Sequence, residues 1–171
     1  HWRLSVKEAQ ELQHDIMGYL PGFATPRIVC DVPFVGKRWV HQIADYDRER
    51  GTVTLVIQSL GKTTLEMRDH YKAGDSFADF VGPLGLPQHV GKFGHVVLVG
   101  GGLGVAPVYP QLRAFKEAGN RTTGIIGFRN KDLVFWEQKF GAYCDNLIVC
   151  TDDGSYGKPG FVTQALKEVL E

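Results

Sequence analysis

The sequence predicts a small antiparallel β domain over residues 1–92, followed by an α/β domain over residues 93–171. In the first part, short β-rich segments are separated by turn residues, which is typical of antiparallel strands. In the second part, three β-rich runs alternate with helical patterns, which favours a parallel sheet with helices packed against it. A run that contains proline and glycine, Val81–Gly85, is interpreted as the connection between the two parts.

The charge of the chain is balanced, with 19 basic and 19 acidic residues among 171. This balance gives no indication of nucleic acid or an anionic membrane as a partner. No apolar run approaches the length of a membrane span, and no signal-peptide pattern opens the sequence. The three cysteines, Cys30, Cys144 and Cys150, form no C-x-x-C pair, and the histidines lack metal-ligand spacing. We therefore expect a cytoplasmic protein without a disulfide framework or a metal site in this chain.

An amphipathic helix is predicted over residues 4–20. Ser5 and Glu8 have the spacing of a capping box, and Pro21-Gly22 follows as a stop signal. The apolar positions recur at helical spacing: Leu4, Val6, Ala9, Leu12, Ile16 and Leu20. Such a stripe usually packs against a core, and docking to a larger partner is the alternative.

The rest of the first domain is predicted to consist of short strands and one helix. Arg27–Val32 is a short extended segment between prolines. Two clearer strands, Trp39–Tyr46 and Gly51–Ser59, are joined by the charged sequence DRERG as a hairpin turn. A short helix over residues 65–74 ends at a glycine, and Asp75–Phe80 is a further strand.

The strongest functional signal lies at the start of the second domain. An apolar run typical of a buried parallel strand, Val96–Val99, is followed by four glycines, and Pro107 stands near the first turn of the next helix. The glycines are Gly100, Gly101, Gly102 and Gly104. A strand, a glycine turn and a helix N-terminus in succession favour the binding of a phosphate group. A tight turn without a ligand is the alternative, because the spacing departs from G-x-G-x-x-G.

A second strand is predicted over Thr122–Gly127, and a helix over Lys131–Phe140. No acidic residue ends this strand to bind a ribose 2′-hydroxyl. Arg129 and Lys131 stand there instead, and either of them would tolerate a 2′-phosphate or serve only as a solvated surface charge.

A third buried strand is predicted over Asn146–Cys150, and a last helix over Phe161–Leu170. Between them lies a polar loop that contains Asp152, Asp153, Gly154 and Ser155. Because the carboxyl ends of parallel strands meet at one edge of a sheet, this loop and the glycine turn are expected at the same edge. The two carboxylates either bind ribose hydroxyls or cap a turn.

Several of these stretches carry a resemblance to a known family. They occur in the family's order over about three quarters of the chain: Ile43–Thr64, Asp79–Gly85, Val99–Pro110, Gly127–Glu137 and Thr151–Thr163. The chain resembles the small, flavin-carrying subunit of NADH-dependent ferredoxin:NADP oxidoreductases, also named sulfide dehydrogenase small subunit. That subunit belongs to the ferredoxin–NADP reductase superfamily and is akin to the electron-transfer subunit of dihydroorotate dehydrogenase.

The resemblance implies a small FAD-binding β-barrel with an N-terminal helix over residues 1–92 and an NAD(P)-binding domain over residues 93–171. By the family's pattern, the FAD pyrophosphate would be held by Gly61, Lys62, Thr63 and Thr64. The nicotinamide nucleotide would lie on Gly100, Gly101, Gly102, Gly104, Ala106 and Pro107. The family's acidic loop corresponds to Asp152, Asp153, Gly154 and Ser155.

The chain departs from the family's pattern in three places. The Arg-x-Pro-Leu-Thr motif of the family is reduced to Arg38, with Gln42 as a further candidate for a hydrogen bond to the flavin. The helix over residues 4–20 stands where the family has opening barrel strands, so the completeness of the barrel is left open. The chain ends at Glu171, before the family's Cys-Gly-Pro segment and the cysteines of its [2Fe–2S] cluster. The resemblance therefore implies a nucleotide-binding domain truncated at its C-terminus.

The function implied by the resemblance is electron transfer. A hydride would pass between NAD(P)H and FAD, and electrons would go on to iron–sulfur centres of a larger flavoprotein subunit and to ferredoxin. No catalytic acid, base or nucleophile is expected, because the cofactors supply the chemistry. Two alternatives stay open: a non-catalytic nucleotide-binding or interaction subunit, and a dihydroorotate dehydrogenase electron-transfer subunit. The choice between NAD and NADP also stays open.

Overall fold

The computed structural model describes residues 27–32, 37–77, 79–84 and 89–171. The chain divides into two compact units, unit 1 (residues 1–88) and unit 2 (residues 89–171). The helix expected over residues 4–20 lies outside the described residues. Within the described ranges, every helix is too short or too polar to span a bilayer.

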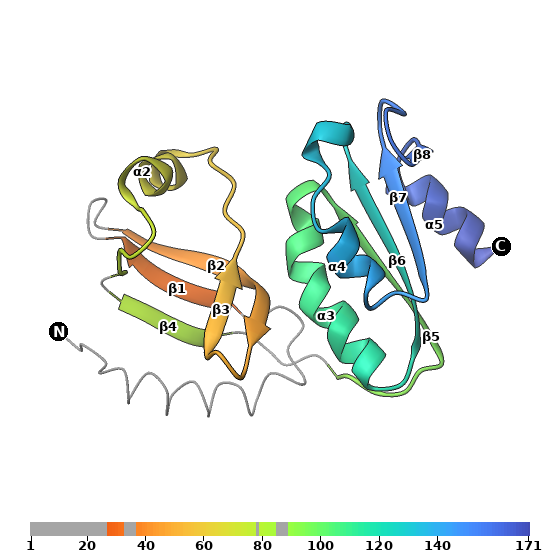
Figure 1. The fold of residues 1–171 in the computed structure, drawn as a ribbon, viewed down its shortest axis with the longest axis horizontal. Coiled ribbons are helices and arrows are strands. Elements are labelled where there is room, and N and C mark those ends of the chain that lie inside the picture. Colours follow the sequence, from red (N-terminus) through yellow and green to blue (C-terminus); the bar gives the residue numbers. More distant parts are fainter. Residues whose placement is uncertain (1–26, 33–36, 78, 85–88) are drawn as a thin grey trace. The chain divides into compact units, whose positions relative to one another are not determined.

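Unit 1 contains a four-stranded antiparallel sheet with the strand order β3-β2-β1-β4 (Figure 1). Its strands are β1 (Arg27–Val32), β2 (Lys37–Asp47), β3 (Thr52–Leu55) and β4 (Asp79–Leu84). The turn after β2 is held by Asp47, whose Oδ1 accepts hydrogen bonds from the N–H groups of Glu49 and Arg50, both at 3.0 Å. Gly51 completes this turn with a φ of 65°. The predicted hairpin is therefore confirmed.

Two elements of unit 1 end earlier than predicted. β3 ends at Leu55 rather than at Ser59. The helix α2 (Lys62–His70) ends before Gly74, which has a φ of 99° and belongs to the turn that follows. That turn is fixed by Asp75, whose carboxylate accepts from the Lys72 N–H at 2.7 Å while its own N–H donates to the Lys72 carbonyl at 3.0 Å.

The strand predicted over Asp75–Phe80 is displaced in the structure. β4 instead spans Asp79–Leu84 and includes Gly82 and Pro83, which were interpreted as part of a connection. Among the described strands, β4 lies at the edge of the sheet and pairs with β1 alone. An edge strand tolerates proline because one row of its N–H groups needs no partner strand. The correction therefore follows from the position of the strand in the sheet.

Unit 2 is built on a four-stranded parallel sheet with the order β5-β6-β7-β8. Its strands are β5 (His95–Gly101), β6 (Arg121–Phe128), β7 (Asn146–Thr151) and the short β8 (Lys158–Pro159), which the sequence did not predict. The helices are α3 (Val105–Glu117), α4 (Glu137–Gly141) and α5 (Val162–Leu170), with two 3₁₀ turns, η2 (Gly102–Gly104) and η3 (Lys131–Leu133). An antiparallel sheet followed by a parallel sheet with helices confirms the predicted fold class.

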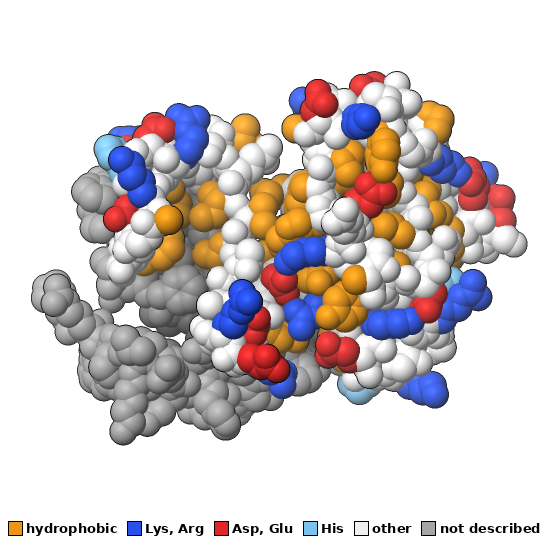
Figure 2. Space-filling model, viewed as in Figure 1, with side chains coloured by type: hydrophobic (Ala, Val, Ile, Leu, Met, Phe, Trp, Pro, Cys, Tyr) orange, Lys and Arg blue, Asp and Glu red, His pale blue; other side chains and the backbone are white. Residues whose placement is uncertain are grey.

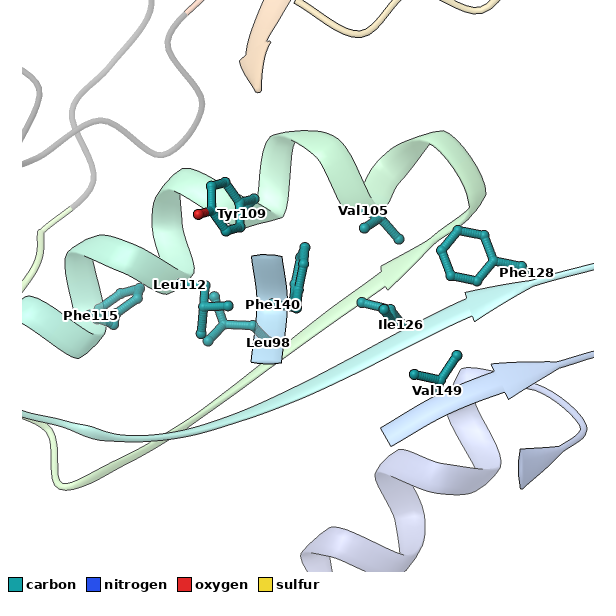
Figure 3. Packing of buried hydrophobic residues seen from close by; sticks show 9 residues of the cluster. All are labelled: Leu98, Val105, Tyr109, Leu112, Phe115, Ile126, Phe128, Phe140 and Val149. Atoms are coloured by element: carbon teal, nitrogen blue, oxygen red, sulfur yellow. The ribbon is translucent and has the colours of Figure 1, made fainter. Parts of the chain in front are cut away.

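Helices cover both faces of the parallel sheet. On one face, α3 and α4 pack over a cluster that includes Leu98, Leu112, Ile126 and Phe140 (Figure 3). On the other face, α5 packs against Ile125 and Cys150, among others. β6 is therefore buried along its length from Thr122 to Phe128, as expected for a central strand between two helical layers. Figure 2 shows positive and negative side chains interspersed over the visible surface, as the balanced composition predicts.

The helix predicted over Lys131–Phe140 is wrong. The 3₁₀ turn η3 is followed by an irregular segment, and α4 begins only at Glu137. The ring of Phe135 packs on that of Phe128 with centroids 5.5 Å apart, and Trp136 packs on Tyr109 at 5.5 Å. These contacts coincide with a chain reversal at Trp136, which has a φ of 60°. A continuous helix would point these two side chains in other directions.

Lys116 and Asp145 fasten the end of α3 to the segment before β7. The Asp145 carboxylate accepts hydrogen bonds from Lys116 Nζ at 2.6 Å and from the Thr122 N–H at 2.8 Å. These hydrogen bonds lower the pKa of Asp145 to about 2, and the bond from Lys116 has the largest effect. Since the folded-state pKa lies below the ordinary value, this carboxylate stabilises the fold at neutral pH, and the contribution is lost as the pH falls through the folded pKa.

We expect Asp145→Asn to have a flatter dependence of Tm on pH than the wild type between about pH 5 and about pH 2. Thermal unfolding followed by circular dichroism at several pH values measures it. Asp132→Asn, which removes an exposed carboxylate in η3, is the control. If both variants keep the pH dependence of the wild type, the Lys116–Asp145 contact does not contribute to acid sensitivity.

Candidate functional site

The glycine turn lies where β5 ends and α3 begins. β5 ends at Gly101, η2 covers Gly102–Gly104, and α3 starts at Val105. Gly101 and Gly102 are exposed, and Gly102 has a φ of 52°, a conformation that favours glycine. The predicted succession of strand, glycine turn and helix is therefore confirmed.

The glycines of this turn have two different roles. A Cβ added to Gly100 would lie 2.9 Å from the Val105 Cα, so Gly100 permits close packing of the strand on the helix. A Cβ added to Gly101, Gly102 or Gly104 would meet nothing within 4 Å. The first glycine thus serves the fold, whereas the other three leave open space beside their own backbone, with the exposed side chain of Leu103 between Gly102 and Gly104.

The N-terminus of α3 borders this open space. α3 has 13 residues, and no side chain caps its N-terminus at Gly104. Ala106 is buried in the first turn of α3, and Pro107 is half-buried beside it. Both side chains therefore pack toward the protein interior. An uncapped helix N-terminus with open backbone next to it is suited to an anion such as a phosphate.

The loops that follow β6 and β7 reach the same edge of the sheet. In the parallel register, Gly101 pairs with Gly127, and Gly127 pairs with Cys150. Arg129 is the first residue after β6 and Asp152 the first after β7, and both are exposed. Their backbones are joined, because the Asp152 N–H donates to the Phe128 carbonyl at 2.9 Å and the Asp153 N–H to the Arg129 carbonyl at 3.2 Å.

Gly127 was not among the predicted site residues. A Cβ at this position would collide with the Val162 side chain, so Gly127 lets α5 approach β6 at the site edge. A glycine inside a β-rich run is a recognisable signal of close approach, and it could have been used.

Two of the predicted ligand-binding side chains are engaged within the loop after β7. The Asp153 carboxylate accepts hydrogen bonds from the Ser155 hydroxyl at 2.6 Å and from the Ser155 N–H at 2.9 Å, which lowers the pKa of Asp153. Gly154 forms the bend between them with a φ of 70°. No hydrogen bond or ion pair engages the side chains of Arg129 and Asp152 within the described part of the chain. The latter two are therefore the available charged groups at this edge.

In unit 1, the predicted FAD residues lie at the N-terminus of α2. The Thr64 hydroxyl accepts hydrogen bonds from the N–H groups of Leu60 and Gly61, both at 3.1 Å, and donates to the Gly61 carbonyl at 3.0 Å. Thr64 therefore contributes to the N-terminal cap of α2, and its hydroxyl is hydrogen-bonded within the protein. Thr63 is buried, whereas Lys62 is exposed, with its Nζ 3.9 Å from Glu66.

Arg38 and Gln42 both lie on β2, paired with Asp31 and Arg27 of β1. Gln42 is exposed. Among the described residues, no group of three or more His, Cys, Asp or Glu side chains is placed to hold a metal ion.

We expect Thr64→Val to destabilise unit 1 by about 1 kcal/mol, because the Gly61 N–H loses the Thr64 hydroxyl as acceptor and the Leu60 N–H keeps only the Gln58 carbonyl. Urea denaturation of the protein without added cofactor measures this effect. Thr64→Ser keeps the hydroxyl and should stay close to the wild type. Equal destabilisation by both substitutions would contradict the capping role.

No family model matches the chain. A protein of Clostridium beijerinckii described as an uncharacterized protein in the adh 3′ region is 44% identical over an alignment of 142 positions, which covers 79% of this chain and 48% of that protein. The dihydroorotate dehydrogenase B (NAD(+)), electron transfer subunit homolog of Thermotoga maritima is 43% identical over 135 residues, with 79% and 47% covered. A chain of the NADH-dependent reduced ferredoxin–NADP oxidoreductase, solved in work on flavin-based electron bifurcation, is 38% identical. It superposes with a TM-score of 0.78 over 87% of this chain and 53% of that chain.

This chain spans about half the length of the curated relatives it matches. The similarity extends through both units, since it covers 87% of the chain in the structural superposition. It confirms the resemblance that the motifs indicated. The chain therefore shares the fold of a chain of NADH-dependent reduced ferredoxin–NADP oxidoreductase, and it is related, over about half of their length, to that protein and to the dihydroorotate dehydrogenase B electron transfer subunit homolog.

Proposed function

We propose that this chain binds FAD through unit 1 and a pyridine dinucleotide through unit 2, and that it acts as part of an electron-transfer subunit. The observation that carries the proposal is the open glycine turn at the uncapped N-terminus of α3. When both cofactors are bound, their chemistry is hydride transfer between NAD(P)H and FAD, followed by transfer of single electrons. The protein supplies binding, orientation and electrostatics.

In unit 2, the diphosphate would lie against the backbone of Gly101, Gly102 and Gly104, which themselves carry no side chain. Asp152 would accept hydrogen bonds from ribose hydroxyls and repel a 2′-phosphate. Arg129 would attract that phosphate. It lies near Asp152 in the backbone, because the residues directly before the two, Phe128 and Thr151, are paired in the sheet. The side chains of Arg129 and Asp152 have opposite effects on the choice between NAD and NADP, so both coenzymes belong in the binding assay.

In unit 1, the FAD pyrophosphate would approach the N-terminus of α2 at Gly61, where a Cβ would meet nothing within 4 Å. Lys62 adds a positive charge there, and Thr63 contributes backbone at the first turn. Arg38 and Gln42 on β2 would bind the FAD phosphate and the flavin ring, respectively, as the family's motif suggests. Thr64 supports this site as a cap.

The partner that we propose is a larger iron–sulfur flavoprotein subunit, with ferredoxin as an electron partner and the cytoplasm as the location. The support is the name of the Thermotoga maritima relative, which is that of an electron transfer subunit homolog. The [2Fe–2S] cluster expected in the family has no cysteine set for it in this sequence.

The test is a visible spectrum of the purified chain before and after addition of FAD, followed by addition of NADH without oxygen. We expect a flavin spectrum with FAD, and its bleaching with NADH. A protein that stays colourless with added FAD would contradict the flavin part of the proposal. Bleaching of the flavin spectrum by NADPH but not by NADH would identify NADP as the coenzyme.

A non-catalytic dinucleotide-binding subunit is the second candidate. The engagement of the Thr64 hydroxyl in the helix cap and the loss of most of the Arg-x-Pro-Leu-Thr motif favour it. Calorimetry with NADH, NADPH and FAD separately distinguishes the two. Dinucleotide binding without flavin binding would support the second candidate. An electron-transfer subunit of dihydroorotate dehydrogenase agrees with the same relatives, and activity with the corresponding catalytic subunit would identify it.

A further inference from the structure

Ser155 joins the loop after β7 to the loop after β6. Its hydroxyl accepts a hydrogen bond from the backbone N–H of Lys131 at 2.8 Å and donates to Asp153 Oδ1 at 2.6 Å. A serine hydroxyl has one proton to donate. In this structure that proton is already directed at Asp153, so the Ser155 side chain links the two loops instead of pointing a donor at a ligand.

Tyr156 makes a second connection between the same loops. Its hydroxyl lies 3.1 and 3.0 Å from the two carboxylate oxygens of Glu137 and donates to that carboxylate. The backbone of Tyr156 is fixed in turn by the fully buried Thr151, whose hydroxyl donates to the Tyr156 carbonyl at 2.6 Å and accepts from its N–H at 3.0 Å. Lys131 Nζ lies 5.9 Å from the centroid of the Tyr156 ring.

The two connections hold the two ends of one segment, residues 131–137. Lys131 opens the 3₁₀ turn after β6, and Glu137 is the first residue of α4. Between them stands Trp136 with a φ of 60°, the one non-glycine residue with positive φ in the described part of the chain. Such a conformation persists only where the surrounding contacts hold it. The connections at both ends, and the packing of Trp136 on Tyr109, provide that restraint.

Resting on the proposed dinucleotide site, we propose that Ser155 and Tyr156 are positioning residues: they fasten the loop after β6 to the loop after β7, so that Arg129 and Asp152 form one preorganised wall beside the glycine turn. Ser155 then acts on the ligand through Lys131 and Asp153 and does not contact it. This changes the role that the sequence predicted for Ser155, and it adds Tyr156 and Glu137 to the site.

The first experiment needs no ligand. Amide hydrogen exchange of the Lys131 N–H is compared in the wild type, Ser155→Ala and Ser155→Thr. We expect exchange to be about 5- to 10-fold faster in Ser155→Ala, because that N–H loses its acceptor, and restored in Ser155→Thr, which keeps a hydroxyl. Unchanged exchange in Ser155→Ala would overturn the proposal.

The second experiment measures the Kd of NADH for each substitution, made once in the wild type and once in an Asp152→Ala background. We expect Ser155→Ala to weaken binding by about 3- to 10-fold and Tyr156→Phe by about 2- to 5-fold in the wild type. A positioning role predicts a smaller factor for Ser155→Ala in the Asp152→Ala background, because the charged group that Ser155 helps to place is already gone. If Ser155 contacted the ligand directly, its substitution would weaken binding by the same factor in both backgrounds, and the proposal would be wrong. Thr163→Ala, an exposed position in α5, is the control that should bind like the wild type.

The binding data distinguish a failure of the proposed function from a failure of the positioning role alone. If the wild type binds neither NADH nor NADPH, the proposed function is wrong and the positioning role falls with it. If the wild type binds NADH and Ser155→Ala and Tyr156→Phe bind it equally well, the proposed function stands and only the positioning role is wrong.

Discussion

Gly101→Val is expected to weaken NADH binding by at least about 100-fold while leaving the fold intact. Gly101 has a φ of −120° and a ψ of 134°, an extended conformation that valine adopts readily. A Cβ there meets nothing within 4 Å, so the new side chain costs no packing. It would occupy the open surface against which the diphosphate is proposed to lie. Fluorescence titration with NADH, together with thermal unfolding of the free protein, measures both parts of the expectation.

Gly100→Val is the matched comparison one position earlier. Here a Cβ would lie 2.9 Å from the Val105 Cα, and the obstacle is backbone that cannot swing away. We expect this variant to be destabilised by about 1–3 kcal/mol, as for other overpacked positions. Binding of NADH by Gly101→Val with the affinity of the wild type would show that the diphosphate does not use this turn.

Asn120→Ala is expected to lower the free energy of unfolding of unit 2 by about 2–4 kcal/mol. Asn120 is 3% exposed and follows the C-terminal end of α3. Its Oδ1 accepts from the N–H groups of Phe93 and Gly94 at 2.6 and 3.1 Å, and its Nδ2 donates to the carbonyls of Gly91 and Phe115 at 2.9 and 2.8 Å. Truncation removes the side-chain partner of all four backbone groups, and only the Phe115 carbonyl keeps a further donor, the Asn120 N–H at 3.2 Å. Partly buried polar groups are costly to leave unpaired.

Urea denaturation followed by circular dichroism tests this expectation. Asn146→Ala, which changes an exposed asparagine at the start of β7, is the control and should shift the free energy of unfolding by less than about 0.5 kcal/mol. Similar free energies of unfolding for the two variants would mean that the hydrogen bonds of Asn120 to the segment before β5 do not stabilise unit 2. Asn120→Asp is also expected to be destabilised, because a carboxylate cannot donate to the two carbonyls.

Much of unit 2 could be predicted because its signals are local. The β-branched run of Val96–Val99, the glycines that follow, and the helical spacing after Pro107 lie within a few residues of one another. Local backbone preference and hydrophobic period are enough to specify such a strand–turn–helix unit. The positions of Arg129 and Asp152 followed in the same way, since each directly follows a predicted strand and parallel strands end at one edge.

The errors arose where distant residues decide the conformation. The helix predicted over Lys131–Phe140 is interrupted where Phe135 and Trp136 pack on Phe128 and Tyr109 of other elements. β4 continues through Pro83 because it lies at an edge of the sheet. β8 has two residues, and only its pairing with β7 makes it a strand. None of these facts is contained in a window of neighbouring residues.

By itself, the sequence determined the fold class, the glycine turn and the resemblance to known proteins, because these depend on local preference and on motifs that survive in linear order. Only the tertiary structure decided which side chains at the site are free to meet a ligand. It engaged the hydroxyls of Thr64 and Ser155 in hydrogen bonds within the protein and left Arg129 and Asp152 exposed. The physical reason is that a polar side chain bonds to whichever partner the folded backbone brings within about 3 Å, and for Ser155 that partner is Lys131, on a different loop.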